Sequence, residues 1–206
     1  MRVCLFAILV CLATAVTAQS DVKRGEAAYV VCATCHGAEA AGNRALAAPA
    51  LANLDADYIS RQLLNFRSGR RGGAGDSATA IQMRAMAAVL ADEGAVADVS
   101  AYISSLPKLA TVATVDGDPA AGQSQYNMIC GACHGGRAEG NGPLQSPALA
   151  GVDDWYLLNQ LNAFRTGTRG SHKDDRLGRQ MRSMAAVITS DKAARDVVAY
   201  IHSMER

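Results

Sequence analysis

The chain has 206 residues with 20 basic and 19 acidic side chains, and half of its residues are hydrophobic. Once Arg2 is set aside with the N-terminal segment, acids and bases balance, both before residue 113 and after it. This neutral balance argues against nucleic acid or an anionic membrane as the main partner.

Residues 1–18 have the pattern of a secretory signal peptide. Arg2 precedes an apolar run that ends in small residues, and cleavage after Ala18 fits this pattern. The run is too short for a stable spanning helix, and no later segment approaches the roughly 20 apolar residues that a membrane crossing needs. We therefore expect an exported, soluble protein of the periplasm, with no transmembrane anchor after cleavage.

The rest of the chain repeats itself. An offset of 98 residues matches the following pairs: Cys32 and Cys130, His36 and His134, Pro49 and Pro147, Phe66 and Phe164, Met83 and Met181. One residue is gained in the second copy, between Gly122 and Cys130. Because chance does not hold a register over this length, the sequence predicts a tandem duplication with domains at residues 19–112 and 113–206.

Each copy is predicted to be all-α with long loops. The expected helices begin near Val22, Tyr58 and Asp92 in the first copy, and at Pro119, Tyr156 and Ser190 in the second. The loops are rich in Gly, Ala, Arg and Pro and are too long for a bare helical bundle. A domain of roughly 90 residues also buries little surface, so we expect each copy to wrap around another apolar body.

The motif that carries chemistry is VCATCHG at residues 31–37, which returns as ICGACHG at residues 129–135. CxxCH is a haem-attachment signature, in which two thiols add across the porphyrin vinyl groups and the histidine lies under the iron. The predicted haem-binding residues are Cys32, Cys35, Cys130 and Cys133, and the predicted iron ligands are His36 and His134.

Three other uses of the cysteines explain less of the pattern. A redox CxxC pair requires neither the following histidine nor a second copy. A zinc site would have to gather four thiolates from motifs 98 residues apart. Plain disulfides are common in exported proteins but leave both histidines unexplained.

Each copy also contains QMRxM, at residues 82–86 and 180–184, just ahead of the last expected helix. A methionine thioether opposite the histidine raises the reduction potential of a haem iron and closes it to substrates. Methionines often serve as packing residues, but the repetition at a fixed distance from CxxCH favours a ligand role. The pattern alone does not decide between the two methionines of each pair.

CATCHG with QMRAM, followed by CGACHG with QMRSM, resembles the dihaem class I cytochromes c of the cytochrome c4 type, over residues 25–203. The resemblance implies a small helical haem fold in each copy and two covalently bound haem c groups. It implies Met83 and Met181 as the iron ligands and leaves Met86 and Met184 as packing residues. It further implies that the two haem edges approach each other across the domain interface.

Two other groups of residues fit this resemblance. Pro49 and Pro147 each follow their histidine by 13 residues, near the spacing at which such cytochromes offer a proline carbonyl to the imidazole N–H. Six arginines flank the loops that lead to the methionines: Arg67, Arg70, Arg71, Arg165, Arg169 and Arg179. Since guanidinium groups pair with carboxylates, we expect at least one arginine–propionate contact in each half.

These features predict a periplasmic dihaem electron-transfer protein and not an enzyme. Its expected partners are redox proteins such as a terminal oxidase, a quinol–cytochrome c reductase or a dehydrogenase. Two alternatives stay open: a cytochrome subunit of a larger dehydrogenase or oxidase complex, and a dihaem oxidoreductase with one open haem.

Overall fold

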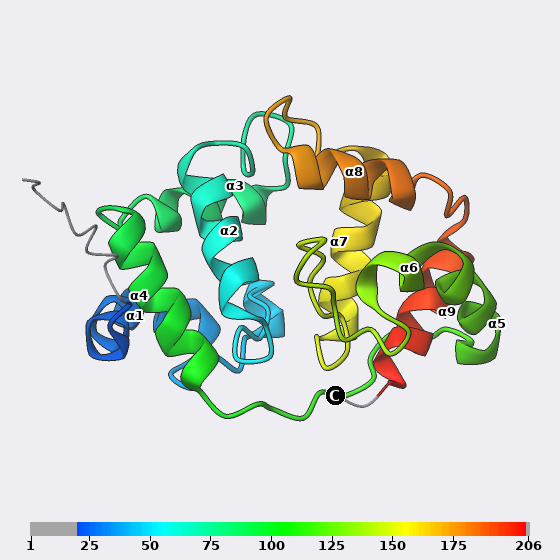
Figure 1. Cartoon of the computed structure of the whole chain (residues 1–206), viewed down its shortest axis with the longest axis horizontal. Helices are drawn as coiled ribbons and strands as arrows, with labels where there is room; N and C mark the ends of the chain where they lie inside the picture. The colour runs from blue at the N-terminus through cyan, green and yellow to red at the C-terminus, as the bar shows by residue number, and fades with distance from the viewer. Residues whose placement is uncertain (1–19, 205–206) are drawn as a thin grey trace, which may run out of the picture.

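The computed structural model describes residues 20–204, which form two helical domains side by side (Figure 1). The predicted signal peptide, residues 1–18, lies outside the described residues. The all-α prediction is confirmed, since β-type pairing within residues 20–204 is limited to two isolated bridges, Asn43–Ala48 and Asn141–Ser146. No helix in this range has the length and hydropathy of a membrane span.

The two domains contain corresponding elements in the same order. Domain 1 has α1 (Val22–His36), a short 3₁₀-helix (Arg44–Leu46), α2 (Ala56–Arg67), α3 (Ala78–Ala87) and α4 (Glu93–Ser105). Domain 2 has α5 (Pro119–Gln125), a π-helical turn (Tyr126–Cys130), α6 (Gly131–His134), α7 (Asp154–Thr166), α8 (Arg176–Ala185) and α9 (Asp191–His202). Helices α2 and α7 lie at the centre of the molecule (Figure 1).

Helix starts follow the capping signals in the sequence. The Ser190 side chain accepts a hydrogen bond from the backbone N–H of Ala193 and so caps α9 as predicted, and Pro119 occupies the first turn of α5. Helices α2 and α7 begin at Ala56 and Asp154, two residues before the predicted tyrosines.

The methionine pairs precede the last helix of each copy, as predicted, but they lie in helices of their own that the sequence analysis did not predict. Helix α3 carries Met83 and is capped by Ser77, and helix α8 carries Met181 and is capped by Asp175. Apolar periodicity is weak in α3, whose alanines are spread around the helix, whereas α8 has Leu177, Met181 and Met184 at helical spacing. Alanine propensity and the polar caps favour the helices nonetheless.

The first and last helices of each domain cross closely at a glycine. A Cβ atom on Gly25 would collide with the carbonyl oxygen of Asp98, and one on Gly122 with that of Asp196. The same aspartates accept hydrogen bonds from the backbone N–H groups of Asp21 (2.6 Å) and Asp118 (2.9 Å) through their side chains. The crossing therefore fixes α1, which carries the cysteine motif of domain 1, and α5, which leads into the motif of domain 2.

We expect Gly122→Ala to destabilise domain 2 by about 3 kcal/mol, because the added methyl group meets rigid backbone. Gly136→Ala is the matched control, since a Cβ atom there meets nothing within 4 Å. Thermal unfolding of both variants checks the prediction. Equal melting temperatures for the two would contradict the close crossing.

Polar contacts hold the two domains and the chain between them together. The buried carboxylate of Asp154 accepts hydrogen bonds from the backbone N–H and the hydroxyl of Thr114, both at 2.6 Å. The Asn53 side-chain amide donates to the carbonyls of Leu109 (2.8 Å) and Gly151 (2.6 Å). Leu157 of α7 packs against the apolar cores of both domains, so the interface has a shared apolar centre.

Candidate functional site

Each domain contains one cavity lined by the cysteines, the histidine and the methionines of its own copy. The eight predicted site residues divide into two sets: Cys32, Cys35, His36 and Met83 line the cavity of domain 1, and Cys130, Cys133, His134 and Met181 line that of domain 2. The cavity volumes are about 450 and 180 Å³, respectively. The structure thus brings each predicted set together although its members lie on different helices.

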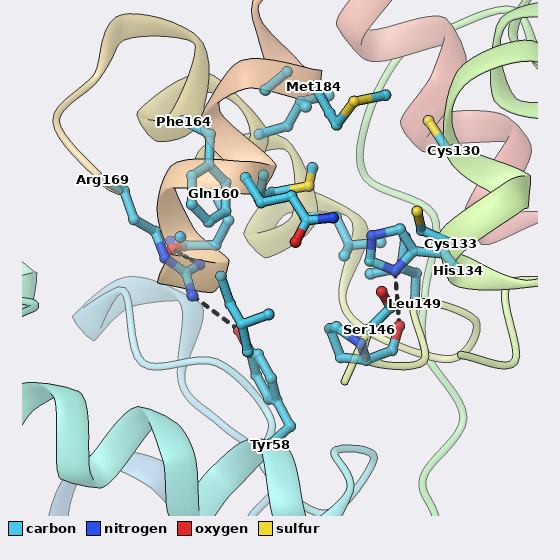
Figure 2. Close-up of a pocket in the computed structure, with 18 of the residues that line it drawn as sticks. Tyr58, Cys130, Cys133, His134, Ser146, Leu149, Gln160, Phe164, Arg169 and Met184 are labelled. Atoms are coloured by element: carbon cyan, nitrogen blue, oxygen red, sulfur yellow. Dashed lines mark hydrogen bonds between the residues drawn. The ribbon is translucent and has the colours of Figure 1, made fainter. Parts of the chain in front are cut away.

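Both histidines are buried and held by a proline carbonyl. His36 Nδ1 lies 2.8 Å from the Pro49 oxygen, and His134 Nδ1 lies 2.9 Å from the Pro147 oxygen (Figure 2). The predicted proline contacts are therefore confirmed. A carbonyl only accepts, so Nδ1 donates and Nε2 carries the free lone pair of the neutral ring.

Burial lowers the pKa of both His36 and His134, and the hydrogen bond to the proline carbonyl opposes this effect. The rings are consequently neutral at physiological pH. A neutral imidazole with an oriented Nε2 lone pair is the form that binds a metal ion.

The four cysteines of the two motifs form no disulfide within the described residues. Burial raises the pKa of Cys32, and it raises the pKa of Cys130 to about 11. Redox-active CxxC pairs have a lowered thiol pKa, so this environment does not fit a thiol–disulfide catalyst. The two pairs also line separate cavities, which excludes a zinc site built from all four thiolates.

The residue gained in the second copy is absorbed by a π-helical turn, Tyr126–Cys130. The tyrosine is three residues before the first cysteine in domain 1 and four residues before it in domain 2. The Tyr29 hydroxyl nevertheless donates to the Gly37 carbonyl at 2.8 Å, and that of Tyr126 donates to the Gly135 carbonyl at 2.6 Å. The insertion therefore leaves the end of the CxxCH helix fixed in the same way.

Both methionines of each pair line the cavity with their histidine. Met83 packs against the cluster that contains Phe66, whereas Met184 is 39% exposed. In Figure 2 the Met184 side chain lies at one edge of the cavity, away from the ring of His134. In domain 2 burial thus favours Met181, which is half-buried, over Met184, whereas Met83 and Met86 of domain 1 are both half-buried.

Two of the six predicted arginines face the cavities, and both lie at the domain interface. Arg71 and Arg169 are 8% and 7% exposed, and Arg169 lines both cavities. The other arginines with recorded contacts lie elsewhere, since Arg67 donates to the Ala91 carbonyl and Arg165 donates to Ile188 and Asp191.

The partners of the buried arginines are residues that sequence reasoning missed. Each guanidinium donates to the side-chain oxygens of both Gln62 and Gln160, at distances of 2.6 to 3.0 Å. The only sequence signal is that Gln62 and Gln160 correspond under the 98-residue offset, as do Tyr58 and Tyr156. Figure 2 shows Arg169 reaching from domain 2 toward Tyr58 of domain 1.

This interface carries excess positive charge. Within the described residues, the hydrogen bonds of Arg71 and Arg169 all go to neutral oxygens, and the charge of Asp175 acts on Arg169 without a hydrogen bond. Burial alone would raise the pKa of Tyr58, but the two arginines lower it to about 8. Since buried charges require a counter-charge, the site fits a ligand that brings anionic groups to the interface.

Comparison with known proteins agrees with this geometry. The family model for cytochrome c matches residues 22–107 and 119–205. The chain is 37% identical over 168 residues to the thiosulfate dehydrogenase electron acceptor of Stutzerimonas stutzeri (strain A1501), covering 77% of this chain and 74% of that protein. It is 29% identical to cytochrome c4 of Pseudomonas aeruginosa, covering 91% of this chain and 90% of that protein.

Solved structures give the same result. Reduced recombinant cytochrome c4 from Pseudomonas stutzeri matches with a TM-score of 0.67 and 25% identity, over 91% of this chain and 100% of that one. Thiosulfate dehydrogenase (TsdBA) from Marichromatium purpuratum matches with a TM-score of 0.68 and 29% identity, over 88% of this chain and 40% of that one. The chain therefore belongs to the cytochrome c family, as a two-domain member of the cytochrome c4 type with two covalently bound haem c groups.

Proposed function

We propose that this protein is an exported electron carrier that passes single electrons between redox proteins. The observation that carries the proposal is the donor set of each cavity: two free thiols, a neutral imidazole and a thioether around apolar walls. A histidine and a methionine together saturate a haem iron and leave no position for a substrate. The repetition of this set favours a carrier over an enzyme with one open haem.

Each residue has a definite role in this proposal. The thiols of Cys32 and Cys35 bind one haem through thioether bonds, and those of Cys130 and Cys133 bind the other. His36 and Met83 ligate the first iron, and His134 and Met181 ligate the second. When bound, the haem iron supplies a one-electron couple between its ferric and ferrous states.

The surrounding protein keeps this site rigid and dry. The proline carbonyls fix the orientation of both imidazole rings and make them stronger electron donors to a metal. The buried tyrosines beside the motifs hold the end of each CxxCH helix in place. Electron transfer is fast when the structure changes little between the two oxidation states. A rigid ligand set keeps this change small.

We assign Arg71 and Arg169 to the haem propionates. Their guanidinium groups are buried between the two cavities with neutral hydrogen-bond partners, and propionates supply the missing negative charge. Because Arg169 lines both cavities, it acts on both haems.

Arg169→Gln is expected to lower both reduction potentials by roughly 50 mV, because a nearby positive charge stabilises the reduced iron. Arg165→Gln is the matched control, since its guanidinium already pairs with Asp191 at 2.9 Å. Spectroelectrochemical titration resolves the two couples. Equal potentials for the two variants would contradict the assignment of Arg169.

For the donor, we propose a periplasmic dehydrogenase of sulfur compounds. Relatives in Stutzerimonas stutzeri and Thiomonas intermedia are named as electron acceptors of thiosulfate dehydrogenase. A related proposal is that the chain serves as a subunit, because the matched TsdBA chain is longer and this protein covers 40% of it. Gel filtration of native extract distinguishes a free carrier from a subunit.

The ferric absorption spectrum tests the proposed function. A sulfur-to-iron charge-transfer band that accounts for both haems supports a carrier, whereas a high-spin signal from one haem supports an enzyme. Thiosulfate alone is expected to leave the ferric protein oxidised. Reduction is expected only after a thiosulfate dehydrogenase is added.

A further inference from the structure

The cavity of domain 2 opens beside two arginines, half-buried Arg61 and exposed Arg176, that contact the same residue. Arg61 of α2 lines this cavity and donates to the Gln145 carbonyl at 3.0 Å. Arg176, at the start of α8, donates to the Gln145 side-chain oxygen at 3.2 Å. Arg179 follows one helical turn later and is also exposed. We call Arg61, Arg176 and Arg179 the arginine rim.

Two exposed apolar side chains line the same cavity as Arg61. Leu144 is 49% exposed and Met184 is 39% exposed, and both line the cavity of domain 2. Gln145, which both Arg61 and Arg176 contact, directly follows Leu144 in the chain. An apolar spot framed by cations is an arrangement typical of docking sites, in which charge steers the approach and apolar contact excludes water.

Domain 1 lacks this charge at the corresponding positions. Under the 98-residue offset, Arg61 corresponds to Asn159, Arg176 to Ala78 and Arg179 to Ile81. Asn159 lines the cavity of domain 1 as Arg61 lines that of domain 2. At these three positions, domain 2 therefore has three positive charges that domain 1 lacks.

The charge of the arginine rim is available to a partner. Within residues 20–204, the hydrogen bonds of these arginines go to uncharged oxygens: those of Gln145 for Arg61 and Arg176, and the Lys173 carbonyl for Arg179. None of the ion pairs recorded within residues 20–204 includes them. Since the mature chain is neutral overall, electrostatic steering has to come from such a local patch.

We propose that the arginine rim, with Leu144 and Met184, is the docking surface for a redox protein whose own exposed centre is surrounded by carboxylates. This inference rests on the proposed function, and it assigns the acidic partner to domain 2. An anionic membrane is a poorer occupant, because three cations fall short of the clusters of about four to eight that bind acidic lipids.

The test uses the hydroquinone form of flavodoxin, an acidic flavoprotein, as a probe that donates one electron to the ferric holoprotein. The rim variant is Arg61→Gln, Arg176→Gln and Arg179→Gln combined. At low ionic strength we expect its bimolecular reduction rate to fall roughly tenfold. The difference is expected to shrink as ionic strength rises through about 0.1 M, where the Debye length is about 10 Å.

A control variant with the same net charge distinguishes the effect of losing the arginine rim from the effect of lowering the net charge. Lys23→Gln, Arg44→Gln and Arg137→Gln remove three exposed cations elsewhere, including Arg44 on the loop of domain 1 that corresponds to the Gln145 loop. We expect this control to react at nearly the wild-type rate. Equal slowing of the two triple variants, or no slowing of the rim variant, would overturn the proposal.

Two further measurements complete the experiment. Co-sedimentation with phosphatidylglycerol vesicles that depends on the rim would point to a membrane and overturn the proposal, whereas its absence supports a protein partner. Reduction by the neutral small molecule benzene-1,4-diol is expected to be the same for all variants. A wild-type protein whose haems accept no electron from either reductant would refute the proposed function itself, independently of the rim.

Discussion

Replacing Cys130 and Cys133 with serine will remove the haem of domain 2 and unfold that domain, while domain 1 keeps its haem. Domain 2 is small, and its buried residues surround a cavity lined by apolar side chains such as Leu161 and Ile188. Without a bound group these walls face water. A domain of this size buries little other apolar surface to balance the conformational entropy that the chain loses on folding. Haem content is expected to fall by half.

Hydrogen exchange followed by mass spectrometry locates the effect. We expect residues 119–204 to lose protection and residues 22–105 to keep most of theirs, apart from segments that contact α7. The mirror variant, Cys32→Ser with Cys35→Ser, is expected to give the reverse pattern. A sharp, cooperative unfolding transition of domain 2 without haem would contradict this account.

Replacing Met181 with leucine will lower the reduction potential of one haem by on the order of 100 mV and convert its iron to a high-spin form. The thioether stabilises the ferrous state and fills the sixth position, and leucine does neither. Met83→Leu is expected to act in the same way on the other haem.

The second methionine of each pair supplies the matched control. Met86→Leu and Met184→Leu change a methionine of the same cavity three residues along the same helix. We expect both variants to keep the sulfur-to-iron charge-transfer band and to shift the potential little. Loss of the band in Met86→Leu or Met184→Leu would instead identify that residue as the ligand.

Motifs with fixed local spacing could be predicted from the sequence. CxxCH places two thiols and an imidazole on one helical segment, and the proline 13 residues later reaches the same imidazole in both copies. The duplication shows each pattern twice, which separates a meaningful spacing from a chance one. The same repetition pointed to the methionines, which line the same cavities as the histidines.

Contacts that depend on tertiary packing could not be predicted. Gln62 and Gln160 are ordinary polar residues on amphipathic helices, and only the approach of α2 to α7 brings them to the buried arginines. The arginines themselves were expected near the haems, and the 98-residue offset matches Arg71 with Arg169. It matches Arg67 with Arg165 equally well, so the sequence did not separate these two pairs.

The helices α3 and α8 illustrate a different limit. In α3 the alanines are spread around the helix, so no apolar face stands out. In α8, by contrast, Leu177, Met181, Met184 and Ala185 recur at helical spacing, so this helix could have been predicted from its pattern. The capping residues Ser77 and Asp175 offer a further signal that the sequence analysis did not use.

The central claim is that this chain carries two haem groups attached through its four mature cysteines. Intact mass spectrometry of the denatured protein, made in a host that matures cytochromes c, tests it most directly. We predict the mass of the chain from residue 19 onward plus two haem groups, in a red protein that stains for haem on a denaturing gel. A colourless protein with the mass of the bare chain would contradict the claim.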